Sequence, residues 1–282
     1  MQKFKFVTDS SADLPKEVAE ALDISVLPIG ITFGTETYYD GVDITPAEFY
    51  EKLRNCTELP KTSQLNQYEF EELFKQYKGS GTALVVILIG SQMSATYSSA
   101  VRAAESLGMQ DEVLLVDSGL VTFALGSFVI EARKLADEAA DLNDLRAKIE
   151  ELRPRVKLYA FVKDLKYLRY GGRLSAASMH IANMLRIHPV VTISGKVDVV
   201  SKQIGVAKCY RYIFERAKQE ADLSYPVYFG NSDCPEEDRL FEERFLSEVK
   251  GAKSFGVPAQ IGPTVGTHAG PGCVGVAFIA KK

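Results

Sequence analysis

One stretch of the chain constrains the fold more than any other. Residues 84–89 form an unbroken run of aliphatic side chains, and Gly90 follows them directly. Small and hydroxyl-bearing residues come next, and then apolar side chains at helical spacing: Ala100, Val101, Ala104 and Leu107. This order predicts a strand that is buried on both faces and turns into a helix, which is the building unit of a parallel α/β sheet.

The turn after this strand lies where α/β proteins bind small ligands. At the carboxyl end of a parallel strand, a helix start offers unpaired backbone N–H groups and the positive end of the helix dipole, which attract an anion. Ser94 and Thr96 would add hydroxyl donors there. Serine is also a common helix-capping residue, so a purely structural role for Ser91 or Ser94 explains the same pattern.

The strand, turn and helix pattern recurs along the first half of the chain. Further strands are predicted at residues 4–8 and 112–116, and residues 24–33 predict another extended segment bent at Pro28. Residues 1–155 are therefore predicted to form an N-terminal three-layer domain with a parallel sheet. Residues 156–282 predict a C-terminal domain with a mixed sheet and helices, because a hairpin through Gly195 implies antiparallel pairing.

Several polar side chains stand near the predicted ends of strands and helices. Thr62 is expected on a loop before an amphipathic helix, and Asp13 is expected to cap the first helix. His268 lies in a glycine-rich stretch, residues 262–275, which predicts a loop before the last strand. Asp9 ends the first strand, where reaching a ligand and forming local loop hydrogen bonds explain it equally well.

The segment Gly171-Gly172-Arg173 predicts a turn. Glycine accepts positive φ, so the two glycines would let a turn project the arginine. A guanidinium suits bidentate contacts with a phosphate or with an acidic residue of a partner protein. A solvated surface charge without a function explains Arg173 equally well.

Composition excludes several classes of function. The net charge of −4, from 33 basic and 37 acidic residues, argues against a nucleic-acid surface and leaves at most a transient membrane contact. No apolar stretch approaches the roughly 20 residues of a membrane span or resembles a secretion signal, so a cytoplasmic protein is predicted. The scattered cysteines and histidines predict no metal site. No phosphate-binding loop is present, so no nucleotide cofactor is expected.

Five stretches taken together resemble the DegV family, to which the fatty-acid-binding subunits of bacterial fatty acid kinases belong. They occur in the family's order, at residues 8–15, 62–64, 91–100, 171–175 and 266–272. The resemblance implies a two-domain α/β protein that encloses one long-chain fatty acid, such as palmitate, in an apolar tunnel between its domains. It also implies that Thr62 and Ser94 hold the carboxylate, with His268 nearby.

The resemblance further implies a carrier and not an enzyme. The carboxylate would be presented to a separate ATP-dependent kinase that forms an acyl phosphate for phospholipid metabolism, with Arg173 contacting the partner or the phosphate. The sequence departs from the family at two places. Ala95 replaces a common glycine, and residues 201–208 keep only two lysines where the family carries several basic residues.

The residue types also fit a second class of function. Ser94, His268 and an acid such as Asp9 or Asp117 would suffice for a serine hydrolase acting on lipid-like esters. The Gly-x-Ser-x-Gly turn that positions the serine in many such enzymes is missing. A catalytic triad is defined by geometry, so the structure decides between the two functions.

Overall fold

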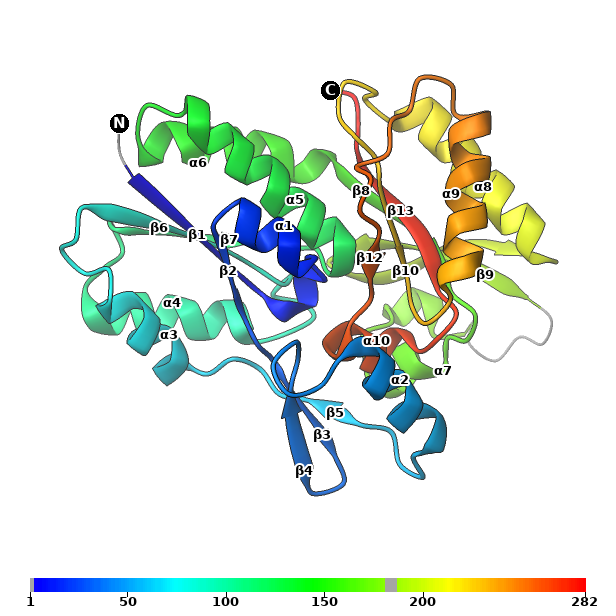
Figure 1. Ribbon diagram of the computed structural model, residues 1–282, viewed down its shortest axis with the longest axis horizontal. Helices are drawn as coiled ribbons and strands as arrows, with labels where there is room; N and C mark the ends of the chain where they lie inside the picture. Colours follow the sequence, from blue (N-terminus) through cyan, green and yellow to red (C-terminus); the bar gives the residue numbers. More distant parts are fainter. Residues whose placement is uncertain (1–2, 181–186) are drawn as a thin grey trace.

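The computed structural model describes residues 3–180 and 187–282 and has two large sheets (Figure 1). The first sheet is parallel throughout, with the strand order β2-β1-β6-β7. Its strands are β1 (Lys3–Asp9), β2 (Ile24–Leu27), β6 (Thr82–Leu88) and β7 (Val113–Asp117). The predicted parallel sheet is therefore confirmed.

Helices cover both faces of this sheet (Figure 1). One face carries α3 (Gln67–Lys75) and α4 (Thr96–Leu107), and the other carries α1 (Lys16–Ala21), α5 (Thr122–Leu135) and α6 (Leu142–Leu152). The aliphatic run in β6 is unbroken because alternate side chains point to opposite faces of the sheet, and helices cover both faces. Val85 and Ile87 pack on the α5 side, whereas Leu84, Val86 and Leu88 pack on the α3 and α4 side.

The second sheet is mixed, with the strand order β10-β9-β8-β13-β11-β12. Neighbouring strands are antiparallel except for the parallel pair β11 and β12. The predicted hairpin is confirmed, with Gly195 at a φ of 75° between β9 and β10. The strands are β8 (Val156–Phe161), β9 (His188–Ser194), β10 (Lys196–Gln203), β11 (Tyr228–Asn231), β12 (Ala259–Gln260) and β13 (Val274–Ile279).

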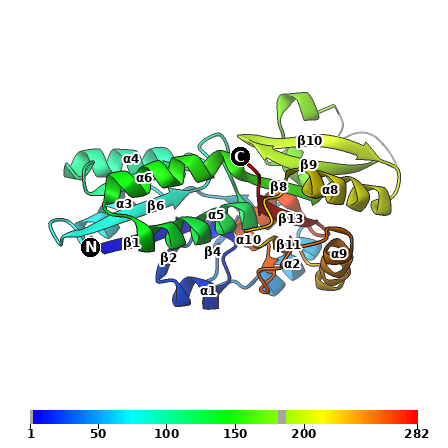
Figure 2. The same cartoon turned by 90° about the horizontal axis from the view of Figure 1, so that it is seen from above.

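The two sheets share helix α5. The helices α8 (Val206–Glu220) and α9 (Pro235–Glu248) cover the outer face of the mixed sheet, and α5 packs on its inner face (Figure 2). Residues 122–132 of α5 are buried without a break, as expected for a helix that is apolar on all sides. One hydrophobic core therefore runs from the parallel sheet to the mixed sheet through α5.

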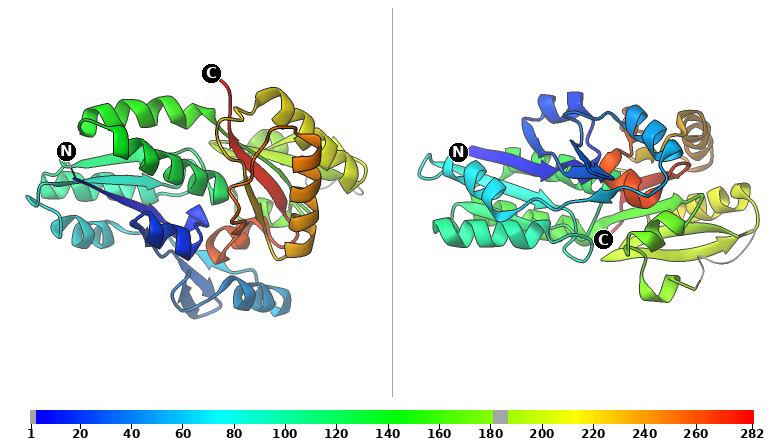
Figure 3. Two further views of the ribbon diagram at one scale, coloured as in Figure 1. Left: turned by 45° about the horizontal axis from the view of Figure 1, so that its top comes forward. Right: turned by 90° about the horizontal axis from the view of Figure 1, so that it is seen from below.

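A small antiparallel sheet lies to one side of the large ones. It has the order β4-β3-β5 and consists of β3 (Gly30–Phe33), β4 (Glu36–Tyr39) and β5 (Lys61–Thr62). Helix α2 (Pro46–Asn55) and the C-terminal helix α10 (Pro263–Ala269) pack together beside it (Figure 3). The hydroxyl of Tyr50 ties the two segments together by donating to the carbonyl of Ile261 at 2.9 Å.

The extended segment predicted at residues 24–33 is present and is interrupted at Pro28, where the chain passes from β2 at the edge of the parallel sheet to β3 of the small sheet. Three other local predictions were wrong. Thr62 lies in a strand, and residues 263–269 form a helix where a loop was predicted. Asp13 does not cap α1; it has a φ of 46°, and its carboxylate accepts hydrogen bonds from Gly262 N–H and the Thr122 hydroxyl.

The remaining helical segments connect the sheets. They are α7 (Lys166–Tyr170) and the short 3-10 turns at Ser10–Ala12, Ala136–Glu138, Arg153–Arg155 and Ala176–Ser178. We propose that the domain boundary lies between Arg155 and Val156, where the last of the parallel-sheet helices gives way to β8. No helix within the described ranges is long and apolar enough to serve as a membrane span.

Candidate functional site

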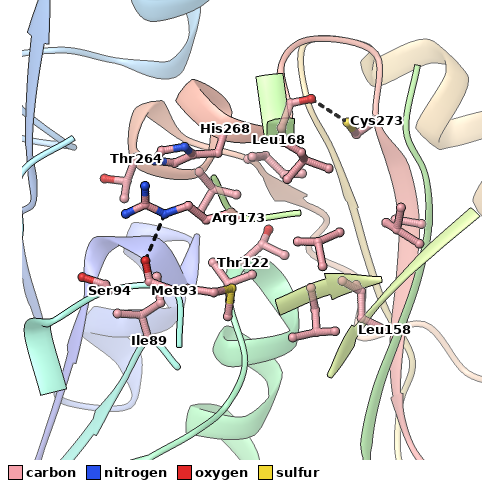
Figure 4. A pocket seen from close by; sticks show the side chains of 18 of the residues that line it. Ile89, Met93, Ser94, Thr122, Leu158, Leu168, Arg173, Thr264, His268 and Cys273 are labelled. Carbon is pink, nitrogen blue, oxygen red and sulfur yellow. Dashed lines mark hydrogen bonds between the residues drawn. The ribbon is translucent and has the colours of Figure 1, made fainter. Parts of the chain in front are cut away.

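A cavity lies between the two large sheets beside the start of α5 (Figure 4). The cavity and its mouth hold about 820 Å³ of space free of protein atoms, part of which is open to solvent. Most of the wall is aliphatic. The larger apolar side chains are Ile29, Ile89, Met93, Val121, Phe123, Leu158, Val162, Leu168, Val191, Ile193, Val197, Ile261 and Val265.

Polar side chains gather at one part of this wall. The cavity is lined by Thr62 of β5, Ser94 before α4, Arg173 after α7 and His268 of α10. These are the four residues that the sequence singled out, and the fold brings them together from four separate segments. Thr264 of α10, which no sequence pattern had indicated, lines the same cavity and lies beside Arg173 in Figure 4.

His268 is bonded to Thr62 and is held neutral by its surroundings. Its Nε2 atom lies 3.0 Å from the Thr62 hydroxyl oxygen. Burial, together with the nearby charge of Arg173, lowers the pKa of His268 to about 4. Its Nδ1 atom is buried and has no hydrogen-bond partner among the described residues. The imidazole is therefore uncharged near neutral pH.

Gly171 makes room for this imidazole. A Cβ atom on Gly171 would lie only 2.0 Å from Nδ1 of His268, so no other residue fits at this position without a rearrangement. Its φ of −71° is open to any residue, whereas Gly172 has a φ of 69°. The prediction of positive φ thus holds for Gly172, and Gly171 is needed for the close approach of His268.

Arg173 is a half-buried cation at the edge of an apolar cavity. Its Nε donates to the carbonyl of Met93 at 3.0 Å, and its guanidinium also donates to the carbonyl of Gly171. Among residues 3–180 and 187–282, no carboxylate forms an ion pair with it. Burial alone lowers its pKa. A desolvated cation without a counter-charge favours an anionic ligand.

Ser94 borders both the cavity and the start of α4. Its hydroxyl lies 3.0 Å from the Thr96 hydroxyl oxygen and accepts a hydrogen bond from Thr96 N–H at 3.3 Å. The helix begins at Thr96, after Ala95 with a φ of −81°. This φ is open to alanine, so Ala95 suits the turn. The N-cap residue of α4 is Ala95, without a side-chain cap bond, so Ser94 does not cap the helix; its side chain lines the cavity.

The buried acids of this region support the backbone around the cavity. The carboxylate of Asp9 accepts from Ile89 N–H at 2.9 Å and Ser11 N–H at 3.0 Å, and burial raises its pKa. Asp40 accepts from Thr264 N–H at 3.0 Å and so fixes the first turn of α10. The sequence left open whether Asp9 reaches a ligand or forms local loop hydrogen bonds. The structure shows the hydrogen bonds.

The geometry does not assemble a serine hydrolase. His268 is bonded to Thr62, whereas Ser94 is bonded to Thr96. Asp117 accepts hydrogen bonds from Gly119 N–H in its own turn and from Ser91 N–H in the turn after β6. A histidine that stays neutral with a pKa near 4 is also a weak general base. The described part of the chain contains no cluster of three His, Cys, Asp or Glu side chains placed to bind a metal.

Comparisons with known proteins identify the family. The family model described as "Uncharacterised protein, DegV family" matches residues 3–281. The chain belongs to the DegV family. A DegV domain-containing protein of Halalkalibacterium halodurans is 33% identical over 288 residues, which cover 100% of both chains. The two-domain α/β fold and the resemblance noted in the sequence are thereby confirmed.

Solved structures of DegV proteins share the fold over the whole chain. DegV of Bacillus subtilis, described as a fatty acid binding protein, aligns with a TM-score of 0.87 at 28% identity and covers 100% of both chains. A stearic acid-binding protein of Eubacterium ventriosum aligns with a TM-score of 0.87 at 25% identity, covering 100% of this chain and 99% of that one.

Proposed function

We propose that this DegV family member binds one long-chain fatty acid in the cavity between its sheets. One observation carries the proposal: an aliphatic cavity whose polar part holds a cation, Arg173, for which the described residues provide no counter-charge. A ligand that complements such a site has one carboxylate and a long apolar body. The fatty acid binding of two similar DegV proteins supports the same conclusion.

The carboxylate is proposed to lie among Thr62, Ser94 and Arg173. A carboxylate only accepts hydrogen bonds, so the Thr62 hydroxyl must donate to it. The Nε2–H of neutral His268 then donates to the Thr62 oxygen, 3.0 Å away. His268 thus acts through Thr62, and its unprotonated Nδ1 faces Gly171.

The acyl chain supplies most of the affinity in this proposal. Burying about 14 methylene groups at roughly 0.8 kcal/mol each gives about 11 kcal/mol of gross stabilisation, before the costs of association and ordering. The carboxylate contributes less to affinity because its hydrogen bonds replace those made with water. Its contacts fix the direction in which the fatty acid enters.

We further propose that the protein is a cytoplasmic carrier that presents the carboxylate to an ATP-dependent kinase. Phosphoryl transfer depends on positioning and charge stabilisation, and Arg173 stands where it would contact the phosphate of an acyl phosphate as well as the carboxylate. The sequence lacks the glycine-rich loops that bind nucleotides, which supports a partner that supplies ATP and Mg²⁺.

Native mass spectrometry tests the binding step. The protein purified from bacteria should carry one fatty acid per chain, or take up one palmitate after delipidation. A protein that is empty and also refuses palmitate would disprove the function. The carrier step is tested by adding a bacterial fatty acid kinase, ATP and Mg²⁺ to the palmitate complex. Binding of palmitate without acyl phosphate formation would remove the kinase step alone.

Hydrolysis of p-nitrophenyl esters separates the carrier from the alternative hydrolase. The hydrogen bonds of Ser94 and His268 to two different threonines predict no turnover above that of a Ser94→Ala variant. Ester turnover that is lost in Ser94→Ala would favour the hydrolase.

A further inference from the structure

A second apolar cavity adjoins the first one. It lies between α5 and the edge of the mixed sheet at β11 and β12, and the space free of protein atoms inside it and at its solvent-open mouth is about 250 Å³. Its wall includes Leu14, Phe255, Val257 and Ala259. Of the described residues, only Phe123 lines both cavities. A single side chain therefore separates the proposed acyl site from additional apolar space.

The backbone at the start of α5 fixes the position of Phe123. Thr122 adopts a φ of 56°, which is unusual for a threonine, and its hydroxyl donates to Asp13 at 2.6 Å. Asp13 in turn accepts from Gly262 N–H at 2.8 Å. Phe123 follows directly and is 3% exposed. The hydrogen bonds from Thr122 to Asp13 and from Gly262 to Asp13 thus fix the backbone that carries the aromatic ring.

The ring also rests directly on the mixed sheet. A Cβ atom on Gly230 of β11 would lie 2.3 Å from a carbon of the Phe123 ring, so the ring occupies the place of the missing side chain. Gly230 pairs with Gly275 on one side and with Ala259 on the other. Ala259 belongs to the second cavity. On the inner face of the sheet, Leu158 and Ala160 line the first cavity on one side of Phe123. Ala259 lines the second cavity on the other side.

We propose that Phe123 closes the acyl tunnel and thereby sets the longest fatty acid that the protein accepts. Removing its ring would join the two cavities, and the second one would receive the terminal methylenes of longer acids. This inference rests on the proposed binding of fatty acids. It assigns to Phe123 a role in chain-length specificity, and none in holding the carboxylate.

Binding of a homologous series of saturated acids to the Phe123→Ala variant tests the proposal. We expect the wild-type affinity to rise with chain length up to a limit and the variant's limit to lie at least two methylenes further along the series from palmitate to behenate. Each additional methylene buried should raise the variant's affinity about fourfold. Phe123→Leu, which preserves more of the core, should shift the limit in the same direction by less.

Two further variants serve as controls. Phe241→Leu removes a ring from the outer core of the mixed sheet, where it lines neither cavity, so it should leave the limit unchanged. Ala259→Leu added to Phe123→Ala fills the second cavity and should restore the wild-type limit. Thermal melts of the delipidated proteins confirm that each variant is folded.

The outcomes separate the two proposals. If the wild type binds no fatty acid, the proposed function is wrong. If the wild type binds palmitate but folded Phe123→Ala and Phe123→Leu keep its chain-length limit, Phe123 does not close the tunnel. An equal shift in Phe241→Leu, or no reversal by Ala259→Leu, would overturn the proposal as well.

Discussion

Replacing Arg173 by methionine removes the one charge that the proposed function depends on. The guanidinium is half buried beside an aliphatic cavity, and the described residues offer it no carboxylate. Methionine keeps an unbranched apolar stem of similar reach but cannot donate to a carboxylate. The substitution should therefore weaken binding of a fatty acid anion and leave binding of a neutral lipid of the same length almost unchanged.

The size of the effect follows from the burial of Arg173. A hydrogen bond to a charged group contributes about 1.5–3 kcal/mol. A Coulomb energy of about 4 kcal/mol, for charges 4 Å apart at an effective dielectric constant of 20, is an upper limit. Because Arg173 is partly open to water, solvent screening keeps the loss of binding free energy in the range of the hydrogen bond and below the Coulomb limit. We expect a loss of about 2 kcal/mol, or roughly 30-fold in the Kd of palmitate.

Calorimetric titration with palmitate and with hexadecanol measures this effect. Hexadecanol has the same chain without the charge, so it reports any damage to the Met93 and Gly171 contacts of Arg173. Arg216→Met on the outer side of the mixed sheet is the matched control and should change neither affinity. If Arg173→Met weakens both ligands equally, or leaves palmitate unaffected, the electrostatic reasoning fails.

Three further predictions concern the hydrogen-bonded groups of the site. Thr62→Ala and Ser94→Ala should each weaken palmitate binding by about 1–3 kcal/mol in a displacement assay, and unchanged affinities would reject the proposed carboxylate position. Gly171→Ala should lower the melting temperature because the new methyl group clashes with His268. Adding His268→Ala should restore part of that loss. The loss caused by Gly172→Ala, which comes from its positive φ, should not be restored by His268→Ala. The lowered pKa of His268, about 4, means that the unfolded chain binds a proton that the folded chain refuses as the pH falls below about 6.5. The unfolding free energy of the ligand-free wild type, from urea titrations, should therefore fall by about 2 kcal/mol relative to His268→Asn between pH 7 and pH 5. A constant difference would show that this histidine is not held neutral.

The parallel sheet could be predicted from the sequence because its signal is local and strong. A strand covered by helices on both faces must be apolar at every position, and residues 84–89 meet that requirement. The hairpin at Gly195 is also local, since the turn needs a residue that accepts positive φ. The small sheet could not be predicted in this way. Its short strand β5 exists only because a distant strand, β3, pairs with it.

The polar part of the cavity was predicted by residue type but not by contact. Thr62 and His268 are 206 positions apart, and no local pattern shows that they are bonded. The need for glycine at position 171 cannot be read from the sequence either, because a larger residue would clash with His268 of the distant helix α10. The helical state of residues 263–269 was missed because Gly266 disfavours a helix and glycines flank the segment on both sides. Asp40 and Asp13, which come from distant segments, hold the start of this helix through backbone N–H groups.

The cavity combines one cation with one neutral histidine, and this pairing has a physical reason. A protonated His268 beside Arg173 would place two positive charges next to an apolar wall, and both burial and the charge of Arg173 lower the pKa of the imidazole. A single carboxylate neutralises one cation and leaves no excess charge in the cavity. The neutral imidazole still donates one hydrogen bond, through which it orients the Thr62 hydroxyl. A site with this balance of charge suits a monoanion with a long apolar chain, which is the ligand of the proposed function.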